Sequence, residues 1–292
     1  MLKINQCLWF DNQAEEASQF YTSVFKKSKV GRKARYGKSA AAMSGQKEGS
    51  VMTVEFQLEN LTILALNGGP LFQQTPALSF FVWCDTEKEI DDLWRQLSQG
   101  GKVRMGLDKY SFAPKYGFTA DKYGVNWQLI LKPNKQKMAP AFLFVDNLFG
   151  KGQEAIDFYS SIFENSKVEF NSRDESTKTI MHCLFSLEEQ NFVLMEGQGK
   201  HNFAFNNSFS LYVVCETQKE IDHFWSRLSK GGSEGPCGWL RDKFGVSWQI
   251  VPSIVGKLAA DKDTKKADRV MKAILEMKKL DMKTLLAAAQ SP

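Results

Sequence analysis

The sequence is poor in the side chains that most often hold metal ions. Its 292 residues include three histidines, His182, His201 and His223, and no two of these stand at equivalent places in the internal repeat described below. Zinc, nickel and iron sites need imidazole, carboxylate or thiolate ligands that converge on one point. We therefore expect the histidines to make ordinary hydrogen bonds at the surface or in the core, and we predict no bound transition metal.

Cysteine is also scarce, and its spacing suits neither a metal site nor a disulfide framework. The five cysteines are odd in number and form no C-x-x-C pair. Reduced, buried thiols in a cytoplasmic protein are the simplest interpretation. Cys84 and Cys215 stand at matching strand ends before a helix, where the pKa of a thiol can fall, but the adjacent Asp85 and Glu216 oppose that effect. We expect these two cysteines to be structural.

Long apolar runs and nucleotide-binding motifs are missing as well. No run reaches the length of a membrane span, and residues 2–8 are too polar and too short for a signal peptide. No G-x-G-x-x-G follows a strand and opens a helix, and the Asn-Gly-Gly-Pro of residues 67–70 lacks the lysine of a phosphate loop. No Ser/His/Asp set recurs. The sequence thus predicts no membrane partner and no cofactor.

Positive charge is in slight excess, and its distribution does not indicate nucleic-acid binding. The formal net charge is +5, and many of the basic side chains lie between residues 257 and 283. Acidic side chains such as Asp261, Asp268 and Glu276 interleave with them. This mixture is typical of a solvated helix face, so we expect no nucleic-acid partner.

What the chain does contain is a long internal repeat. Residues 82–94 return at 213–225 in nearly the same order, and both copies run on to a glycine pair. Residues 121–128 return at 242–249. A repeat of this length is too long for a solenoid unit, so the sequence predicts two copies of one domain.

Within each copy the apolar pattern predicts a strand, a helix and three strands, and then the same order again. In the first copy we expect helices at 13–26 and 86–99, where apolar residues recur at helical spacing. The expected strands of that copy are 4–10, 29–36, 50–58, 61–66, 78–84, 102–106, 111–121 and 125–131. The fold class is therefore α+β, with four such βαβββ modules.

We place the domains at residues 1–133 and 139–255, followed by a helical tail at 256–292. Residues 132–140 are polar and bounded by prolines, as in an interdomain linker. The glycine-rich residues 37–49 are expected to form a loop. The first copy also holds about ten extra residues around 108–118, aromatic and basic, which suit equally a lid over a ligand and a longer hairpin packed on the other domain.

Several separate sequence motifs, in the order in which they occur here, resemble those of a known family. They include Leu8-Trp9-Phe10-Asp11, then residues 65–70, then residues 79–82, and finally the run from Cys237 to Pro252. Together with the paired modules they are similar to the PhnB-like branch of the vicinal oxygen chelate superfamily. Proteins of this branch are often labelled as demethylubiquinone methyltransferase-like. The resemblance implies that the two modules of each copy form one incomplete, eight-stranded barrel around a cleft. It implies little about activity, because this fold hosts many functions.

In metal-using members of that superfamily, inward-facing positions on the first and last strand of each module hold the metal. Counted from nearby landmarks, these positions fall near Asn5 and Leu143, at Gln128 and Gln249, and at four apolar positions. The four apolar positions are Ile63, Leu78, Phe192 and Phe209. One glutamine per domain does not make a metal site, so the resemblance does not change the prediction of a metal-free protein.

The residues left to line the clefts are large amphipathic rings and amides, which suit a mostly apolar small-molecule pocket. They are Trp9, Trp127, Gln128, Trp239, Trp248 and Gln249. Neighbouring residues on a strand point to opposite faces, so some of these tryptophans belong to the core, and we expect the glutamines to face the clefts.

The sequence therefore favours a protein that binds a small molecule in its clefts without a metal ion. The alternative is an enzyme of unknown reaction that uses Gln128 and Gln249, and a third interpretation is a scaffold whose clefts are filled by side chains. The duplication also predicts an intrachain pseudo-dimer. The apolar stripe of Val270, Ile274 and Met277 in the tail suits either docking on its own chain or a homodimer contact.

Overall fold

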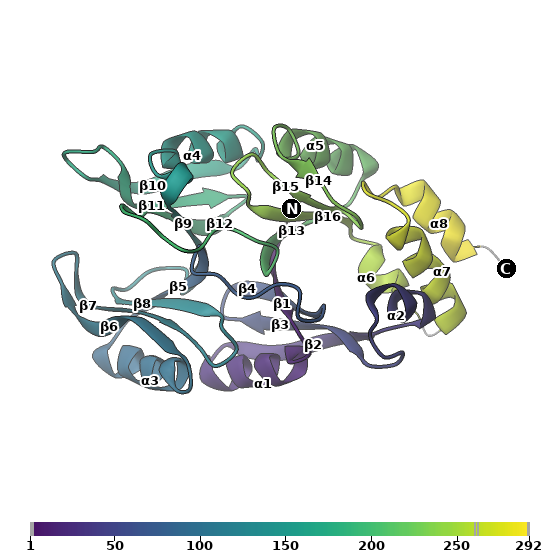
Figure 1. Ribbon diagram of the computed structural model, residues 1–292, viewed down its shortest axis with the longest axis horizontal. Helices are drawn as coiled ribbons and strands as arrows, with labels where there is room; N and C mark the ends of the chain where they lie inside the picture. Colours follow the sequence, from purple (N-terminus) through teal and green to yellow (C-terminus); the bar gives the residue numbers. More distant parts are fainter. Residues whose placement is uncertain (1–2, 260, 262, 291–292) are drawn as a thin grey trace.

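The computed structural model describes residues 3–259, 261 and 263–290, and its elements follow the repeated order (Figure 1). Module 1 comprises β1 (Lys3–Phe10), α1 (Ala14–Val24), β2 (Ser28–Arg35), α2 (Lys38–Ser44), β3 (Val51–Leu58) and β4 (Leu61–Asn67). Module 2 comprises β5 (Leu78–Cys84), α3 (Glu87–Ser98), β6 (Lys102–Tyr110), β7 (Ala113–Ala120) and β8 (Asn126–Leu131). Within these residues, no helix is long and apolar enough to cross a membrane.

The second copy repeats this order and is followed by the tail. Module 3 comprises β9 (Met138–Phe144), the 3-10 helix η1 (Asp146–Leu148), α4 (Gly152–Ser160), β10 (Ser166–Arg173), β11 (Ile180–Leu187) and β12 (Gln190–Glu196). Module 4 comprises β13 (Phe209–Cys215), α5 (Gln218–Leu228), β14 (Ser233–Glu234), β15 (Trp239–Arg241) and β16 (Ser247–Pro252). The tail forms α6 (Val255–Leu258), α7 (Thr264–Leu275) and α8 (Met282–Gln290).

The sheets are built from modules of different copies. Sheet A has the strand order β14-β15-β16-β13-β1-β4-β3-β2, so it joins module 1 to module 4. Sheet B has the order β10-β11-β12-β9-β5-β8-β7-β6, so it joins module 2 to module 3. The expectation that the two modules of each copy form one eight-stranded barrel was therefore wrong, because each sheet takes one module from each copy. The central contacts are the antiparallel pairs β1–β13 and β5–β9, which make the chain an intrachain pseudo-dimer with exchanged modules.

One face of each sheet is covered by helices, and these faces form a common core. Ile90 of α3, Tyr159 of α4 and Leu228 of α5 are buried in it, together with the tryptophans of β8 and β16. The repeated threonine before α3 and α5 explains where these helices begin, because the Thr217 hydroxyl accepts a hydrogen bond from the amide of Glu220 in a complete capping box. Burial of the apolar stripe and the cap together favour helix at this position in both copies.

The repeated glycine pair has a steric cause. A Cβ atom at Gly101 would lie 2.0 Å from the carbonyl oxygen of Ala120, and one at Gly232 would lie 2.0 Å from that of Arg241. Since backbone atoms cannot move aside as a flexible side chain can, only glycine fits where the chain leaves α3 and α5 and approaches the next strands.

Two local expectations need correction, and residues 108–118 take one of the two forms left open for them. The glycine-rich stretch 37–49 contains the short helix α2, because its alanines Ala40 and Ala41 are buried. Residues 138–140 of the expected linker belong to β9, which leaves 132–137 as the connection. The extra residues around 108–118 extend β6 and β7 into a longer antiparallel hairpin.

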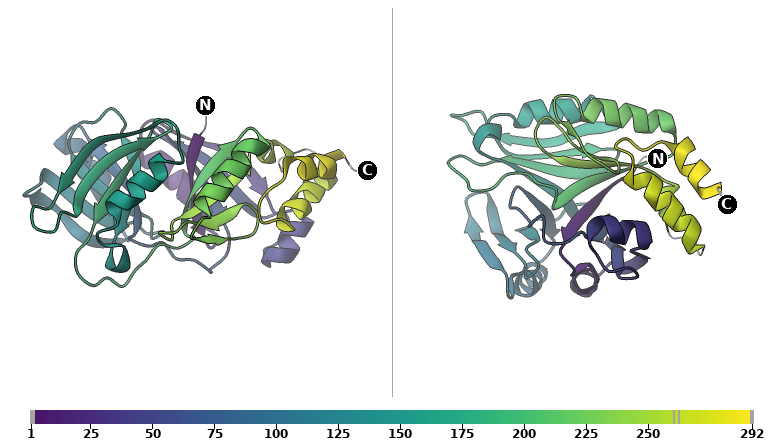
Figure 2. Two further views of the ribbon diagram at one scale, coloured as in Figure 1. Left: turned by 90° about the horizontal axis from the view of Figure 1, so that it is seen from above. Right: turned by 45° about the vertical axis from the view of Figure 1, so that its right-hand side comes forward.

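The tail docks on its own chain at the end of the molecule where sheet A lies (Figures 1 and 2). Val270, Ile274, Leu280 and Leu285 are buried against Val251 of β16. The amides of Cys237 and Gly238 donate to the carbonyls of Met277 and Lys278, both at 2.7 Å. These contacts cover the apolar stripe of α7 within the chain.

A cleft on sheet A and its filled counterpart on sheet B

The face of sheet A turned away from α1 and α5 forms one wall of a cavity of about 660 Å³, which we call the sheet A cleft. Its floor includes Asn5, Cys7, Leu64, Tyr212, Trp239 and Gln249. Its roof comes from α2, α6 and α7 and includes Ala40, Met43, Met271, Ile274 and Leu275. The cleft therefore combines strands of modules 1 and 4 with the tail, and it has the volume of an ordinary small-molecule site.

A row of hydrogen-bonding side chains crosses the floor on neighbouring strands. Asn5 lies opposite Tyr212, Tyr212 lies opposite Gln249, and Gln249 lies opposite Trp239. The Nε2 of Gln249 donates to the Ser210 hydroxyl at 2.9 Å. In the described part of the chain, neither the Asn5 amide nor the Tyr212 hydroxyl has a hydrogen-bond partner, nor does the Oε1 of Gln249. These groups are available to a molecule in the cleft.

Trp9 stands at the edge of the same cleft. Its Nε1 donates to the carbonyl of Gly69 at 2.8 Å, and its ring packs edge-on against Phe72 and Trp239. A Cβ atom at Gly68 would lie 2.1 Å from the Trp9 ring, which explains why glycine follows β4. The Asn-Gly-Gly-Pro turn thus fixes the position of a ring in the cleft wall.

A carboxylate of α7 joins the tail to the first turn of α2 in module 1. Asp268 of α7 accepts hydrogen bonds from the amide of Ser39 at 2.7 Å and from the Ser39 hydroxyl at 2.8 Å. Met271 packs beside this contact, against the small cluster around Tyr36. Figure 2 shows α2 beside α7, and Ser39 and Asp268, which join them, are 229 residues apart in sequence. Asp268 therefore ties the tail to α2 above the cleft.

Removing this carboxylate should loosen the roof. We expect Asp268→Ala to lower the free energy of unfolding by about 1–2 kcal/mol, because two hydrogen bonds to a charged acceptor are lost. Hydrogen exchange at the Ser39 amide should accelerate. Asp263→Ala is the matched control, since Asp263 caps α7 itself through the amides of Lys265 and Lys266. Unchanged exchange in α2 in Asp268→Ala would contradict the contact.

The equivalent face of sheet B is filled by the protein's own side chains. Phe81, Trp83, Tyr116 and Phe118 pack together there and are all buried. The longer β6–β7 hairpin contributes Tyr116, whose ring packs on Tyr110 and Phe112. The extra residues of the first copy therefore help to close this face.

Equivalent positions show what separates the two faces. Phe81 lies opposite Gln128 as Tyr212 lies opposite Gln249, and Trp83 occupies the place of Val214. Phe81 and Trp83 on sheet B are buried. Their counterparts on sheet A, Tyr212 and Val214, are half-buried. The ring of Trp83, where sheet A has Val214, and the ring of Tyr116 from the longer hairpin thus occupy on sheet B the space that remains empty on sheet A.

The two glutamines differ accordingly. Gln128 is 2% exposed, accepts from the Tyr116 hydroxyl at 2.5 Å and donates to the Ser79 hydroxyl at 2.9 Å. Both ends of this amide are engaged within the protein. Gln249 faces the cavity with a free oxygen, so of the two only Gln249 can contact a ligand.

Trp127 and Trp248 do not line either face, which corrects the sequence-based site. Both are fully buried in the helix-covered core, because they alternate with the glutamines along β8 and β16. Their indole nitrogens donate to Asp121 at 2.8 Å and to Asp242 at 2.9 Å. Burial raises the pKa of each of these carboxyl groups to about 6, against the lowering effect of their hydrogen bonds. These are repeated structural networks.

Four of the positions inferred for metal ligands were one residue out of register. Ile63, Leu78, Phe192 and Phe209 lie in the helix-covered core. A shift of one residue exchanges the two faces of a strand. The neighbours that face away from the helices are Leu64, Ser79, Val193 and Ser210.

The donors in the sheet A cleft do not fit a transition metal. At the floor they are the amides of Asn5 and Gln249 and the thiol of Cys7, whose pKa burial raises to about 11. The lining also includes the Glu55 carboxylate, which pairs with Arg32, and the Cys237 thiol, whose pKa burial raises as well. A protonated thiol and two amides are weak ligands for zinc, nickel or iron. Across the described ranges, no three His, Cys, Asp or Glu side chains form a group that would hold a metal ion.

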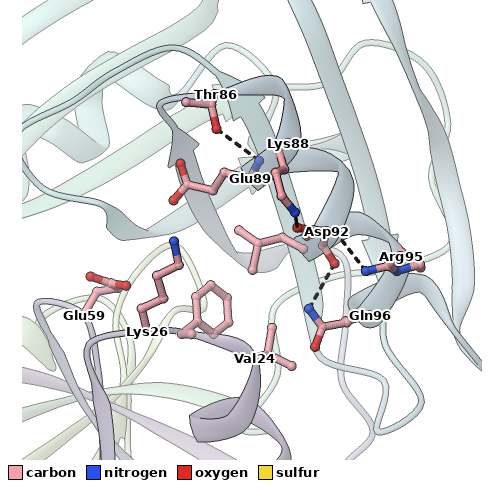
Figure 3. Close-up of a pocket in the computed structure, with 11 residues that line it drawn as sticks. Val24, Lys26, Glu59, Thr86, Lys88, Glu89, Asp92, Arg95 and Gln96 are labelled. Carbon is pink, nitrogen blue, oxygen red and sulfur yellow. Dashed lines mark hydrogen bonds and ion pairs between the residues drawn. The ribbon is translucent and has the colours of Figure 1, made fainter.

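A second hollow, of about 450 Å³, lies between the end of α1 and α3 (Figure 3). Its charged side chains largely satisfy one another: Lys88 and Arg95 both pair with Asp92, at 2.6 and 2.9 Å. Gln96 donates to the carbonyl of Asp92 at 3.1 Å. This hollow offers few free groups, so we assign no function to it.

Sequence reasoning missed part of the cleft. Asn5 was named as an inward-facing position, but Cys7 and Tyr212 were not named as cleft residues, although their alternation with core residues was available in the sequence. The roof residues of α2 and α7 had no such signal, because their position depends on how the tail docks. Trp9, Trp239 and Gln249, which the sequence had singled out, line the cleft.

Comparison with known proteins gives the following relationships. A family model described as 3-demethylubiquinone-9 3-methyltransferase matches twice, over residues 2–130 and 136–251. A PhnB protein from Bacillus cereus is 39% identical over 44% of this chain and 99% of its own, with a TM-score of 0.41. Glyoxalase I from Zea mays is 12% identical over 90% of this chain and 98% of its own, with a TM-score of 0.58, which shows a shared fold alone. No curated protein matches the sequence.

Proposed function

Since the chain belongs to the PhnB-like family described as 3-demethylubiquinone-9 3-methyltransferase, within the vicinal oxygen chelate superfamily, we propose that it binds one small molecule in the sheet A cleft without a metal ion. The sequence contains no methyl-donor motif of the Rossmann type, so the proposal is binding and not methyl transfer.

The observation that carries the proposal is the difference between two equivalent faces of one chain. Sheet A keeps a cavity of about 660 Å³ with unpartnered polar groups, while aromatic rings fill the same place on sheet B. Unpartnered polar groups in a partly buried site weaken a fold unless something pairs with them. Their retention on sheet A alone therefore supports a ligand there and a structural role for sheet B.

The chemistry of the cleft favours binding over turnover. Amides neither give up nor take a proton near neutral pH, and the Cys7 thiol stays protonated because its buried environment raises its pKa to about 11. The enzyme alternative would rest on Gln249, since Gln128 is engaged within the filled face. Orientation of a ligand by Gln249 is the role that these groups suit best.

A thermal-shift screen of flat metabolites and drugs tests this proposal. We expect compounds that stabilise the fold in the presence of EDTA and are recovered unchanged. For such a compound, Gln249→Ala should weaken binding about tenfold, the cost of one hydrogen bond in a desolvated site. The matched variant Gln128→Ala should leave affinity within about twofold, because that amide does not face the cavity.

Three results would overturn the proposal. They are a dependence of affinity on Gln128, a requirement for a divalent metal, and chemical turnover that disappears in Gln249→Ala. The last of these would establish the enzyme alternative instead. Circular dichroism of both variants checks that each has folded.

A further inference from the structure

The part of the sheet A cleft floor formed by β1, β13 and β16 is polar but carries no charge. The row of Asn5, Tyr212 and Gln249 offers two amides and one hydroxyl. Burial raises the pKa of the Tyr212 hydroxyl, so it is neutral at physiological pH. Cys7, which lies against Gln249, is neutral for the same reason. A ligand that reaches the floor meets donors and acceptors only.

The charged side chains lie on β2 and β3 and are paired. Arg32 Nη2 lies 3.1 Å from Glu55 Oε2, and the Arg32 side chain is 62% exposed. Lys33 Nζ lies 2.8 Å from Glu15 Oε1, also in an exposed position. Each cation thus already has its own carboxylate near solvent. No unpaired cation among the described lining residues remains at the floor to balance an anionic ligand.

The walls above the floor are apolar and adaptable. Met43 of α2, Met52 of β3 and Met271 of α7 line the same cavity. Unbranched thioether side chains fill irregular gaps and make favourable contacts with aromatic rings. Trp9 and Trp239 add two rings, 6.2 Å apart and nearly perpendicular. These walls suit a ring system more than a sugar or a phosphate ester.

We infer that the ligand of the sheet A cleft is a neutral, flat, largely apolar molecule with an amide-like edge that both donates and accepts hydrogen bonds. The inference rests on the proposed function and names the class of its ligand. The amide-like edge pairs with the row of Asn5, Tyr212 and Gln249, and the ring system lies among the methionines and tryptophans. A charged edge would lose its hydration without gaining an opposite charge.

Three probes of one shape test the class: 2-naphthamide, which is neutral, 2-naphthoate, an anion, and 2-naphthamidine, a cation. Titration calorimetry on the full chain at neutral pH gives each affinity. We expect 2-naphthamide to bind at least about tenfold more tightly than either charged probe, because each unbalanced charge costs more than one hydrogen bond.

Two variants tie the preference to the floor. Asn5→Leu and Tyr212→Phe remove hydrogen-bonding groups and keep most of the side-chain volume, and each should reduce the preference for 2-naphthamide about threefold or more. Gln128→Leu on the filled face is the control and should leave the preference unchanged. Circular dichroism confirms folding of each variant.

The outcomes separate the class of ligand from the site itself. Tighter binding of 2-naphthoate or 2-naphthamidine, lost in Val214→Trp, which narrows the cleft, would overturn the neutral class and keep the site. Binding of 2-naphthamide that survives Val214→Trp would overturn both, as would no binding of any probe together with no hit in the thermal-shift screen. No binding of the probes alongside charged hits in that screen would overturn the class alone.

Discussion

Replacing Asp242 by asparagine is expected to destabilise the protein by about 3–4 kcal/mol, more than most single substitutions. The buried carboxylate accepts from the Tyr159 hydroxyl at 2.8 Å and from the Trp248 indole nitrogen at 2.9 Å. The amides of Phe244 and Val246 donate to its other oxygen, at 2.9 and 3.0 Å. An asparagine NH₂ would face the Trp248 N–H, and neither group can accept. Chemical denaturation measures the loss.

The repeat supplies a twin and the surface supplies a control. Asp121→Asn should cost a similar amount, because Asp121 accepts from Trp127 at 2.8 Å and from two backbone amides. Asp92→Asn removes an exposed carboxylate with two ion pairs and should cost less than about 1 kcal/mol. If Asp242→Asn cost no more than Asp92→Asn, the buried network would not stabilise the fold as described.

Exchanging one pair of equivalent residues should affect the two faces in opposite ways. Trp83→Val places on sheet B the residue that sheet A has at Val214, and it should destabilise by about 3 kcal/mol, because a buried ring is removed and a cavity is left. Val214→Trp places the larger ring in an existing cavity and should change the free energy of unfolding by less than about 1 kcal/mol. Denaturant unfolding of both variants gives the comparison.

Equal losses in the two variants would contradict the difference between the faces. A large loss in Val214→Trp would mean that the space above Val214 is already packed. A small loss in Trp83→Val would mean that sheet B tolerates an empty face as sheet A does.

The elements of the fold were largely readable from the repeat. The repeated sequence segments predicted the helices α3 and α5 and the strands β8 and β16, because the same apolar spacing and caps occur twice. The pairing of modules was not readable in the same way. The connection of residues 132–137 leads from β8 to β9, and these two strands pair with β5 from opposite sides, so modules 2 and 3 share one sheet.

Which face of its strand each site residue occupies was harder to predict from the sequence. Trp239 and Gln249 lie on the strand face that lines the cleft. Trp127 and Trp248 lie on the opposite face of their strands, in the helix-covered core. In the sequence the two copies also look alike, since Gln128 and Gln249 end the repeated segments 121–128 and 242–249. Their difference arises from neighbours such as Tyr116, which comes from the longer hairpin and engages Gln128.

The most direct test of the account is the stoichiometry of 2-naphthamide binding, measured by titration calorimetry on the wild-type chain and on Val214→Trp. One molecule should bind per wild-type chain, and binding should be lost by about thirtyfold or more in Val214→Trp, because the added ring occupies the ligand's space. Two molecules per chain, or one molecule whose affinity Val214→Trp leaves unchanged, would contradict a single ligand site on sheet A.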